Sequence, residues 1–254
     1  PHPIEMKRLK ELSKKVEEFG FKSDIIIITH YHRDHFDFGN RIDFEIYRGK
    51  ILLIKHPEEK INPKQRFKRA RVLLKKWQSE VIPAKIYYAD GKTFEFDELK
   101  IKFSEPLIHG NNPKMGYVLS VLFRECSESI LYTSDVEGPL LEEQVRFIIN
   151  NPADIVIIDG PPTYLLGSKF KEEELEIAIN NLKRIIKETR PSLILLDHHP
   201  LRDLNYEENL EDFLNFAEEN GVEVMCYAEY IGEPISMLEA RRKELYEKCP
   251  IEET

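Results

Sequence analysis

The sequence is poor in cysteine and tryptophan and has no long apolar run. Its 254 residues include one tryptophan and three cysteines, which lie far apart at positions 126, 226 and 249. An odd number of distant cysteines gives no metal-binding spacing and suggests a reducing compartment. No apolar run approaches the roughly 20 residues of a membrane helix, and no signal peptide is visible. We therefore expect a cytoplasmic protein without a membrane partner.

Glutamine is also scarce, whereas charged residues make up 33% of the chain. Abundant mixed charge with little glutamine is typical of proteins from thermophiles. The formal net charge of -9 argues against a general nucleic-acid coat, although it leaves room for a local basic patch.

Apolar periodicity and turn residues predict a mixed α/β chain. Strands dominate its first part, and after residue 138 apolar strands alternate with helices. Helices are expected at 5–19, 62–77, 139–149, 172–188, 207–219 and 234–248, and strands at 24–29, 50–54, 84–88, 92–96, 99–103, 116–123, 129–133, 154–158, 192–196 and 222–226. No linker or repeat divides the sequence, so we predict a single domain over residues 1–254 in which helices cover sheets.

Three of the eight histidines fall together, directly after a predicted buried strand. The stretch ITHYHRDHFDFG at 28–39 contains His30, His32, Asp34 and His35. Alternate residues of an extended chain face the same side, so His30 and His32 point together, and a turn can bring the next two back. Imidazole and carboxylate groups are ligands of zinc and similar divalent ions. The cluster therefore indicates a metal site rather than a group of surface or hydrogen-bonded histidines.

Polar residues also follow three other predicted strands. They are, in chain order, His109, Asp135 and the pair His198-His199. In α/β proteins, ligands gather beyond the ends of strands, so these residues are further candidates for the same site. His2 is terminal and His56 has no such neighbours, so we expect both to be solvated or hydrogen-bonded.

In kind and order, these residues resemble the metal-binding motifs of the metallo-β-lactamase superfamily. More narrowly, the chain resembles an uncharacterised archaeal family of predicted metallo-hydrolases within it. This narrower resemblance covers nearly the whole chain and rests on THYHRDH, LLIKHPEEKIN, ADGKTFEF, TSDVEGP, DGPPTYL and LDHHPLRD. It implies the αββα sandwich of the superfamily and a hydrolase with two divalent ions, expected to be zinc.

The resemblance also implies the ligand set. The residues implied for the first ion are His30, His32 and His109, those for the second are Asp34, His35 and His198, and Asp135 bridges the two. The superfamily places the last ligand directly after a strand, following Ser or Thr, and here Asp197 holds that preceding position. His198 is therefore preferred to His199. Asp197 would then orient a ligand, and His199 would contact a substrate oxygen.

Two ions in such a site explain hydrolysis without an activated serine or cysteine. A pair of divalent ions lowers the pKa of a shared water toward ~7 and polarises the scissile carbonyl or phosphoryl group. Asp34 is the expected catalytic residue, because it can hold the attacking hydroxide by a hydrogen bond. No GxSxG or GxxxxGK[ST] motif competes with this mechanism.

The chain departs from the superfamily pattern before the first histidine. The superfamily begins with a strand hairpin, whereas the 29 residues before His30 predict one helix and one strand. We therefore expect that N-terminal strands of the sandwich are missing from this chain, which starts at Pro1.

The sequence leaves three classes of function open. A phosphoester or nucleic-acid hydrolase is favoured by the predicted helix at 62–77, whose basic face carries Lys64, Lys68, Arg71 and Lys75. Val72, Leu73 and Trp77 are expected to face inward, and a merely solvated charged face is the alternative. A carboxylic-ester, lactone or thioester hydrolase fits the same ions equally well. A metal-binding protein without turnover is the third class, and it agrees least with a complete dinuclear ligand set.

Two further residues are candidates for substrate contact. Arg202 follows the histidine pair and could reach a phosphate group. Tyr164 lies in DGPPTYLLG, which follows the strand at 154–158. It is expected either to line the substrate pocket or to pack against a stiff proline turn.

Overall fold

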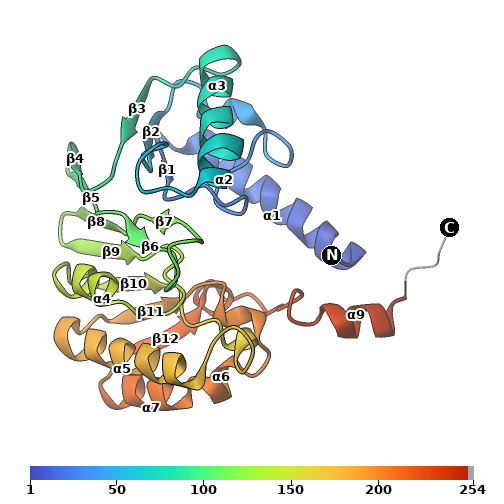
Figure 1. Cartoon of the computed structure of the whole chain (residues 1–254), viewed down its shortest axis with the longest axis vertical. Coiled ribbons are helices and arrows are strands. Elements are labelled where there is room, and N and C mark those ends of the chain that lie inside the picture. The colour runs from blue at the N-terminus through green and yellow to red at the C-terminus, as the bar shows by residue number, and fades with distance from the viewer. Residues whose placement is uncertain (251–254) are drawn as a thin grey trace.

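Two β-sheets of unequal size form the centre of the protein, for which the computed structural model describes residues 1–250 (Figure 1). The smaller sheet has three parallel strands, β1 (Ile25–Ile28), β2 (Ile51–Ile54) and β3 (Lys85–Tyr88). The larger sheet has the order β12-β11-β10-β9-β8-β5-β4. Its strands are β4 (Thr93–Phe96), β5 (Leu99–Phe103), β8 (Val121–Glu125), β9 (Glu128–Tyr132), β10 (Ile155–Ile158), β11 (Leu193–Leu196) and β12 (Glu223–Cys226). A short antiparallel pair, β6 (Leu107–Ile108) and β7 (Tyr117–Val118), lies beside them.

Helices enclose the two sheets. The N-terminal half contains α1 (Pro3–Lys22), α2 (Pro63–Gln65), the π-helical turn η2 (Arg66–Ala70) and α3 (Arg71–Ser79). The C-terminal half contains α4 (Glu142–Ile149), α5 (Glu172–Thr189), α6 (Tyr206–Asn209), α7 (Glu211–Glu219), α8 (Tyr227–Tyr230) and α9 (Arg242–Lys248). Among residues 1–250, no helix is both long and apolar enough to cross a membrane. The expected cytoplasmic location stays a prediction.

Alternation along β2 defines the layers. Leu52 and Ile54 pack with Trp77 of α3, whereas Leu53 faces the other way and packs with Ile101 and Val121 of the larger sheet. Successive strand residues point to opposite faces, so this one strand separates two apolar cores. The smaller sheet therefore lies between α3 and the larger sheet.

The far face of the larger sheet is covered by α4, α5 and α7. Val156 and Ile194 form one buried cluster with Leu182 of α5 and Phe213 of α7. Figure 1 shows these helices at the end of the molecule away from α1 and α3. The layer order is therefore helix, sheet, sheet, helix, which confirms the predicted αββα sandwich of metallo-β-lactamase type.

The predicted elements are present, with four differences. The strand expected at 116–123 is divided into β7 and β8, because Leu119 N donates to Thr29 O (3.1 Å) at the end of β1. Of the helix expected at 234–248, the structure has only α9, and side chains such as Met237 and Leu238 line a cavity beside α1 instead. The helix expected at 207–219 is divided into α6 and α7 at Leu210. The fourth difference lies in the helix expected at 62–77.

That helix is interrupted by the π-helical turn η2. A π turn contains more residues than an α turn, so it rotates the buried face of the helix that follows. Leu73 and Trp77 are buried as predicted, but Val72 is 40% exposed, so its predicted inward position was wrong.

Candidate metal centre

The candidate ligands follow strands whose carboxyl ends meet at one edge. β9, β10 and β11 run parallel to one another, so Asp135 after β9 and His198 after β11 emerge on the same side. β1 of the smaller sheet ends just before Thr29 and leads into the loop that carries His30, His32, Asp34 and His35. His109 directly follows β6. The fold thus brings all seven predicted ligands to one place.

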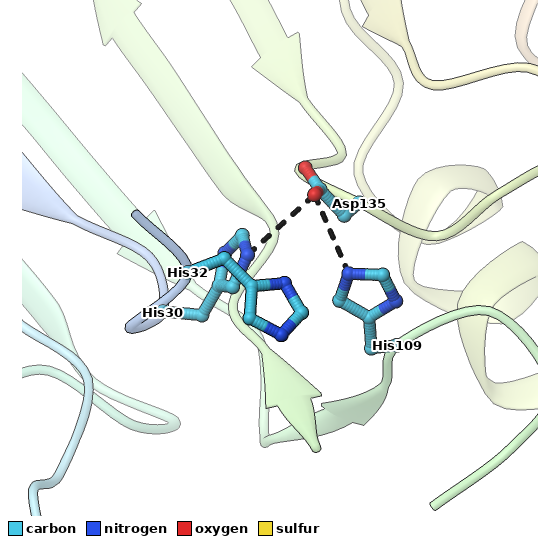
Figure 2. Close-up of side chains that lie close together, drawn as sticks. All are labelled: His30, His32, His109 and Asp135. Atoms are coloured by element: carbon cyan, nitrogen blue, oxygen red, sulfur yellow. Dashed lines mark ion pairs between the residues drawn. The ribbon is translucent and has the colours of Figure 1, made fainter. Parts of the chain in front are cut away.

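One group consists of His30, His32, His109 and Asp135 (Figure 2). Each of them offers a ligand atom within 4.8 Å of the others. Oδ2 of Asp135 lies 3.5 Å from Nε2 of His30 and 3.4 Å from Nε2 of His109. His30, His109 and Asp135 are buried, and His32 is partly exposed.

A second group consists of Asp34, His35 and His198, again with ligand atoms within 4.8 Å of one another. Oδ1 of Asp135 lies 3.1 Å from Nε2 of His35, and Oδ2 lies 3.9 Å from Nε2 of His198. Asp135 therefore stands between the two groups, with one oxygen toward His35 and the other toward His30 and His109. Asp34 is exposed, so this side of the centre opens to solvent.

Several polar atoms of the centre are buried without a hydrogen-bond partner among residues 1–250. They are Nε2 of His30, both ring nitrogens of His109, Oδ1 of Asp135 and Nε2 of His198. Buried polar atoms are normally hydrogen-bonded, so a group of buried atoms without such partners requires an explanation. Their charged neighbours lie at 3.1–3.9 Å without forming hydrogen bonds, as expected for groups that would bind a common cation. Imidazole nitrogens and carboxylate oxygens fit a divalent cation there.

The histidines of the centre differ in their pKa values. Burial is the largest cause that holds the pKa of His30 well below its usual range, and burial followed by the charge of His109 lowers the pKa of His32 to about 4. Both imidazoles are therefore neutral at pH 7, the state in which histidine binds a metal.

Three other histidines have raised pKa values. Burial lowers the pKa of His35, but the hydrogen bond and the charge of Asp135 outweigh it and raise the value above its usual range. Burial lowers the pKa of His109, but Asp135 and Glu137 outweigh it and raise the value to about 9. Burial also opposes the charged form of His198, and Asp197 and Asp159 raise its pKa to about 9. The carboxylates of the centre thus favour the protonated forms of these histidines when no cation is bound.

Sequence reasoning missed Glu137. Its Oε1 lies 3.2 Å from Nδ1 of His109 and 3.6 Å from Nε2 of His199. Glu137 has a φ of 52° and Ser134 a φ of 55°, so the turn around Asp135 holds two non-glycine residues in the left-handed region. Such strain tends to occur at functional sites. No spacing rule singles out Glu137, although it lies in the TSDVEGP stretch.

Asp159 was also missed, although the rule of strand ends applies to it. It directly follows β10, is fully buried, and lies 2.7 Å from Nδ1 of His199. The carboxyl oxygens of Asp159 also accept hydrogen bonds from the backbone N–H groups of Glu137 and His199. His199 is thus engaged with a buried carboxylate.

The remaining candidates lie around the second group. Asp197 Oδ1 accepts a hydrogen bond from the backbone N–H of His198 and lies 3.3 Å from its Nδ1. Arg202 lies over the ring of Tyr164 at 5.9 Å, and its Nε is 3.2 Å from Oε2 of Glu239. His198 and Arg202 line a cavity of about 560 Å³, and Tyr164 is 39% exposed.

The other two histidines have structural partners, as predicted. His2 Nδ1 accepts a hydrogen bond from Ile4 N at the start of α1, and His56 Nδ1 accepts from Glu58 N and Glu59 N.

The predicted basic face of residues 62–77 lies largely in solvent. Lys64, Lys68 and Lys75 are exposed. Arg71 is engaged by Glu58, which lies 2.8 Å from its Nε. Another residue of the same segment, Arg69, reaches the histidine loop, since its Nη1 donates to Tyr31 O at 2.7 Å.

Solved structures share the fold at low sequence identity. CmlA, a beta-hydroxylase from Streptomyces venezuelae, is similar in a mutant form with a TM-score of 0.51 and 14% identity, over 80% of this chain and 43% of CmlA. YhfI, a metallo-beta-lactamase fold protein from Bacillus subtilis, aligns with a TM-score of 0.47 and 17% identity, over 82% of this chain and 76% of YhfI. At this level of identity, the likeness to CmlA concerns the fold alone.

Sequence relatives are much more similar. A UPF0282 protein of Sulfurisphaera tokodaii is 42% identical over 248 residues, which are 98% of this chain and 80% of the relative. A UPF0282 protein of Metallosphaera sedula is 41% identical over 246 residues, which are 97% of this chain and 79% of the relative. No family model matches the chain. With identity of this extent over nearly its whole length, the chain belongs to the archaeal UPF0282 protein family.

Proposed function

We propose that this protein is a metal-dependent hydrolase with a dinuclear centre. In this proposal the first ion is held by His30, His32 and His109, the second by Asp34, His35 and His198, and Asp135 bridges them. The observation that supports it is the position of Asp135, whose two oxygens face different histidine groups at 3.1–3.5 Å. Zinc is the proposed metal, because it is commonly bound by histidine nitrogens together with carboxylate oxygens.

The residues around the ions have distinct roles in this proposal. Bound divalent ions supply an acidified water and polarise the oxygen of the bond that is cleaved. Asp34 lies on the open side of the centre, where its carboxylate can accept a hydrogen bond from the attacking water. Glu137 and Asp197 lie against the Nδ1 atoms of His109 and His198, so they orient the rings whose Nε2 atoms face the centre.

The proposed substrate is a phosphoester, and carboxylic esters, lactones and thioesters are the alternative. The cationic side chains near the open side, Arg202 and Arg69, favour an anionic substrate. The fold itself does not decide the chemistry, because one fold supports many reactions, and CmlA is a beta-hydroxylase.

Elemental analysis of the protein, first as purified and then loaded with metal, tests the proposal when it is followed by a substrate panel. Two ions per chain and turnover of a phosphodiester, phosphomonoester, lactone or thioester are expected. One ion or none in metal-replete protein contradicts the dinuclear centre. Bound iron with no turnover on any ester would instead favour oxidative chemistry, and two zinc ions without turnover would favour a binding protein.

A further inference from the structure

Arg69 stands beside the metal-binding loop with most of its hydrogen-bonding capacity unused. Its Nη1 donates to Tyr31 O at 2.7 Å, and Tyr31 separates His30 from His32 in the chain. A guanidinium carries five N–H donors in a planar fork. Within residues 1–250, the bond to Tyr31 is the one hydrogen bond that this side chain makes, so the other donors remain available to a ligand.

Three other arginines of the same region are occupied by carboxylates, whereas the exposed Arg33 has no ion pair among residues 1–250. Arg66 and Arg71 both pair with Glu58, and Arg202 pairs with Glu239. Arg69 has no such ion pair among the described residues. Its nearest charges include Arg33 and Asp34: burial lowers the pKa of Arg69 most, Arg33 lowers it further, and Asp34 opposes them. A partly buried cation close to another cation is destabilised by burial and by repulsion. A bound anion would stabilise its charge.

Arg69 lies within the π-helical turn. The chain from Asn62 to Ser79 is helical throughout, and the single π turn at Arg66–Ala70 contains Arg69. Arg69 lies between the buried Gln65 and Leu73 in the chain and reaches the histidine loop through its bond to Tyr31 O, while Lys68 is exposed. Single π turns within helices occur often at functional sites.

There is space for a ligand next to this loop. Arg33 and Asp34 line a cavity of about 480 Å³. Asp34 belongs to the second ligand group and is exposed, so a molecule that reaches it lies within the electrostatic range of Arg69.

We propose that Arg69 binds an oxyanion of the substrate, so that the substrate carries a phosphoryl or carboxylate group beside the bond that is cleaved. The inference rests on the proposed function in placing this oxyanion at the metal centre. The planar fork of arginine matches the two oxygens of either group.

A purely structural role for Arg69 predicts a different result. The same helix has a second contact that holds this loop, since Lys76 Nζ donates to Phe38 O at 2.7 Å. If Arg69 only fixed the loop, losing either contact would have similar effects. Lys76→Gln is therefore the control for loop anchoring, and Lys68→Gln is the control for losing one positive charge from the same helix.

Isothermal titration of the metal-loaded protein with inorganic phosphate and, separately, with acetate tests the proposal. For Arg69→Gln, we expect the affinity for the better-bound anion to fall roughly ten- to a hundredfold, the range for a charge-assisted hydrogen bond. Lys68→Gln and Lys76→Gln should stay within about twofold of the unmodified protein, and metal content should not change. The anion that binds more tightly identifies the group as phosphoryl or carboxylate.

Several results would overturn the inference. They are unchanged affinity in Arg69→Gln, an equal loss in Lys76→Gln, or no binding of either anion by the unmodified protein. If Arg69→Gln loses metal, Arg69→Lys takes its place, because a lysine keeps one donor for Tyr31 O but lacks the fork. A loss of anion affinity at full metal content then supports the proposal, and unchanged affinity contradicts it. Anion binding is measured without turnover, so an inactive substrate panel would weaken the proposed function and leave this inference standing.

Discussion

Oε1 of Glu137 lies 3.2 Å from Nδ1 of His109, and Nε2 of the same ring lies 3.4 Å from Asp135. The imidazole is thus held between two carboxylates, one on each nitrogen. A carboxylate on the outer nitrogen fixes the orientation of a ligating ring and increases its basicity.

Replacing Glu137 with alanine should therefore weaken metal binding about ten- to a hundredfold, the range for such outer partners. Glu137→Gln retains an acceptor oxygen and should lose less. Competition with a chromogenic chelator measures both affinities, and Glu143→Gln, on an exposed residue nearby, is the control. Equal affinity in Glu137→Ala and the control would remove Glu137 from the metal centre.

Asp135 and His35 should differ in how many ions their loss affects. Asp135→Ala removes the carboxylate that faces both groups, so both ions should bind less tightly. His35→Ala removes a member of the second group alone, so one ion per chain should remain. Metal stoichiometry at a fixed low free-metal concentration distinguishes them. If Asp135→Ala retained one tightly bound ion, the bridging assignment would be wrong.

The two adjacent histidines should have opposite phenotypes. His198→Ala should lose the second ion with little change in the stability of the metal-free protein, since the His198 side chain is 30% exposed. His199→Ala leaves buried Asp159 without this hydrogen-bond partner, and an unsatisfied buried polar group costs about 1–3 kcal/mol. Thermal denaturation of the metal-free variants and the metal content of the loaded variants test both. The reverse pattern would make His199 the ligand.

Metal removal should lower the stability of the folded protein. A ligand that binds the folded state alone, at a thousand times its dissociation constant, adds about 4 kcal/mol. Chelation should therefore lower the melting temperature, and zinc should restore it. Asp135→Ala is the control, because its melting temperature should respond little to either treatment. An equal response in that variant would place the stabilising ion elsewhere.

Packing behind the histidine loop gives a prediction independent of metal. Leu73 and Trp77 are 0% and 1% exposed, so Leu73→Ala should cost about 2–5 kcal/mol and Trp77→Ala about 3–5 kcal/mol of unfolding free energy. Val72→Ala, at a position that is 40% exposed, should change it by less than about 1 kcal/mol. Urea denaturation measures all three. A large effect of Val72→Ala would contradict the observed orientation of α3.

Site residues could be predicted from the sequence where a side chain that can bind a metal follows the end of a strand. His30, His109, Asp135 and His198 each follow closely on a strand, and the fold brings them together, although their roles as ligands stay predictions. Asp159 obeys the same rule but was passed over, because the DGPPTYLLG stretch was interpreted only as a stiff proline turn that carries Tyr164. Glu137 was not predictable, since only its distance from His109 distinguishes it from other acidic residues.

Local periodicity did not predict the backbone conformation where contacts between distant segments determine it. The stretch from Asn62 to Ser79 has a helical pattern, but that pattern assumes 3.6 residues per turn and does not reveal the π turn. The strand expected at 116–123 was divided because one backbone N–H bonds to Thr29 in the other sheet. Such contacts depend on segments distant in sequence, so no window along the chain contains them.

The candidate ligands come from both sheets, so an ion bound by them would connect the two sheets. His30 extends from β1 of the smaller sheet, whereas Asp135 and His198 extend from β9 and β11 of the larger one. The three cysteines are free, so no disulfide bond joins these parts. An ion held between these residues would be a cross-link that closes very long loops, which restricts the unfolded chain as a disulfide does. The two sheets would then separate most readily in the metal-free protein, at the interface between them where the histidines lie.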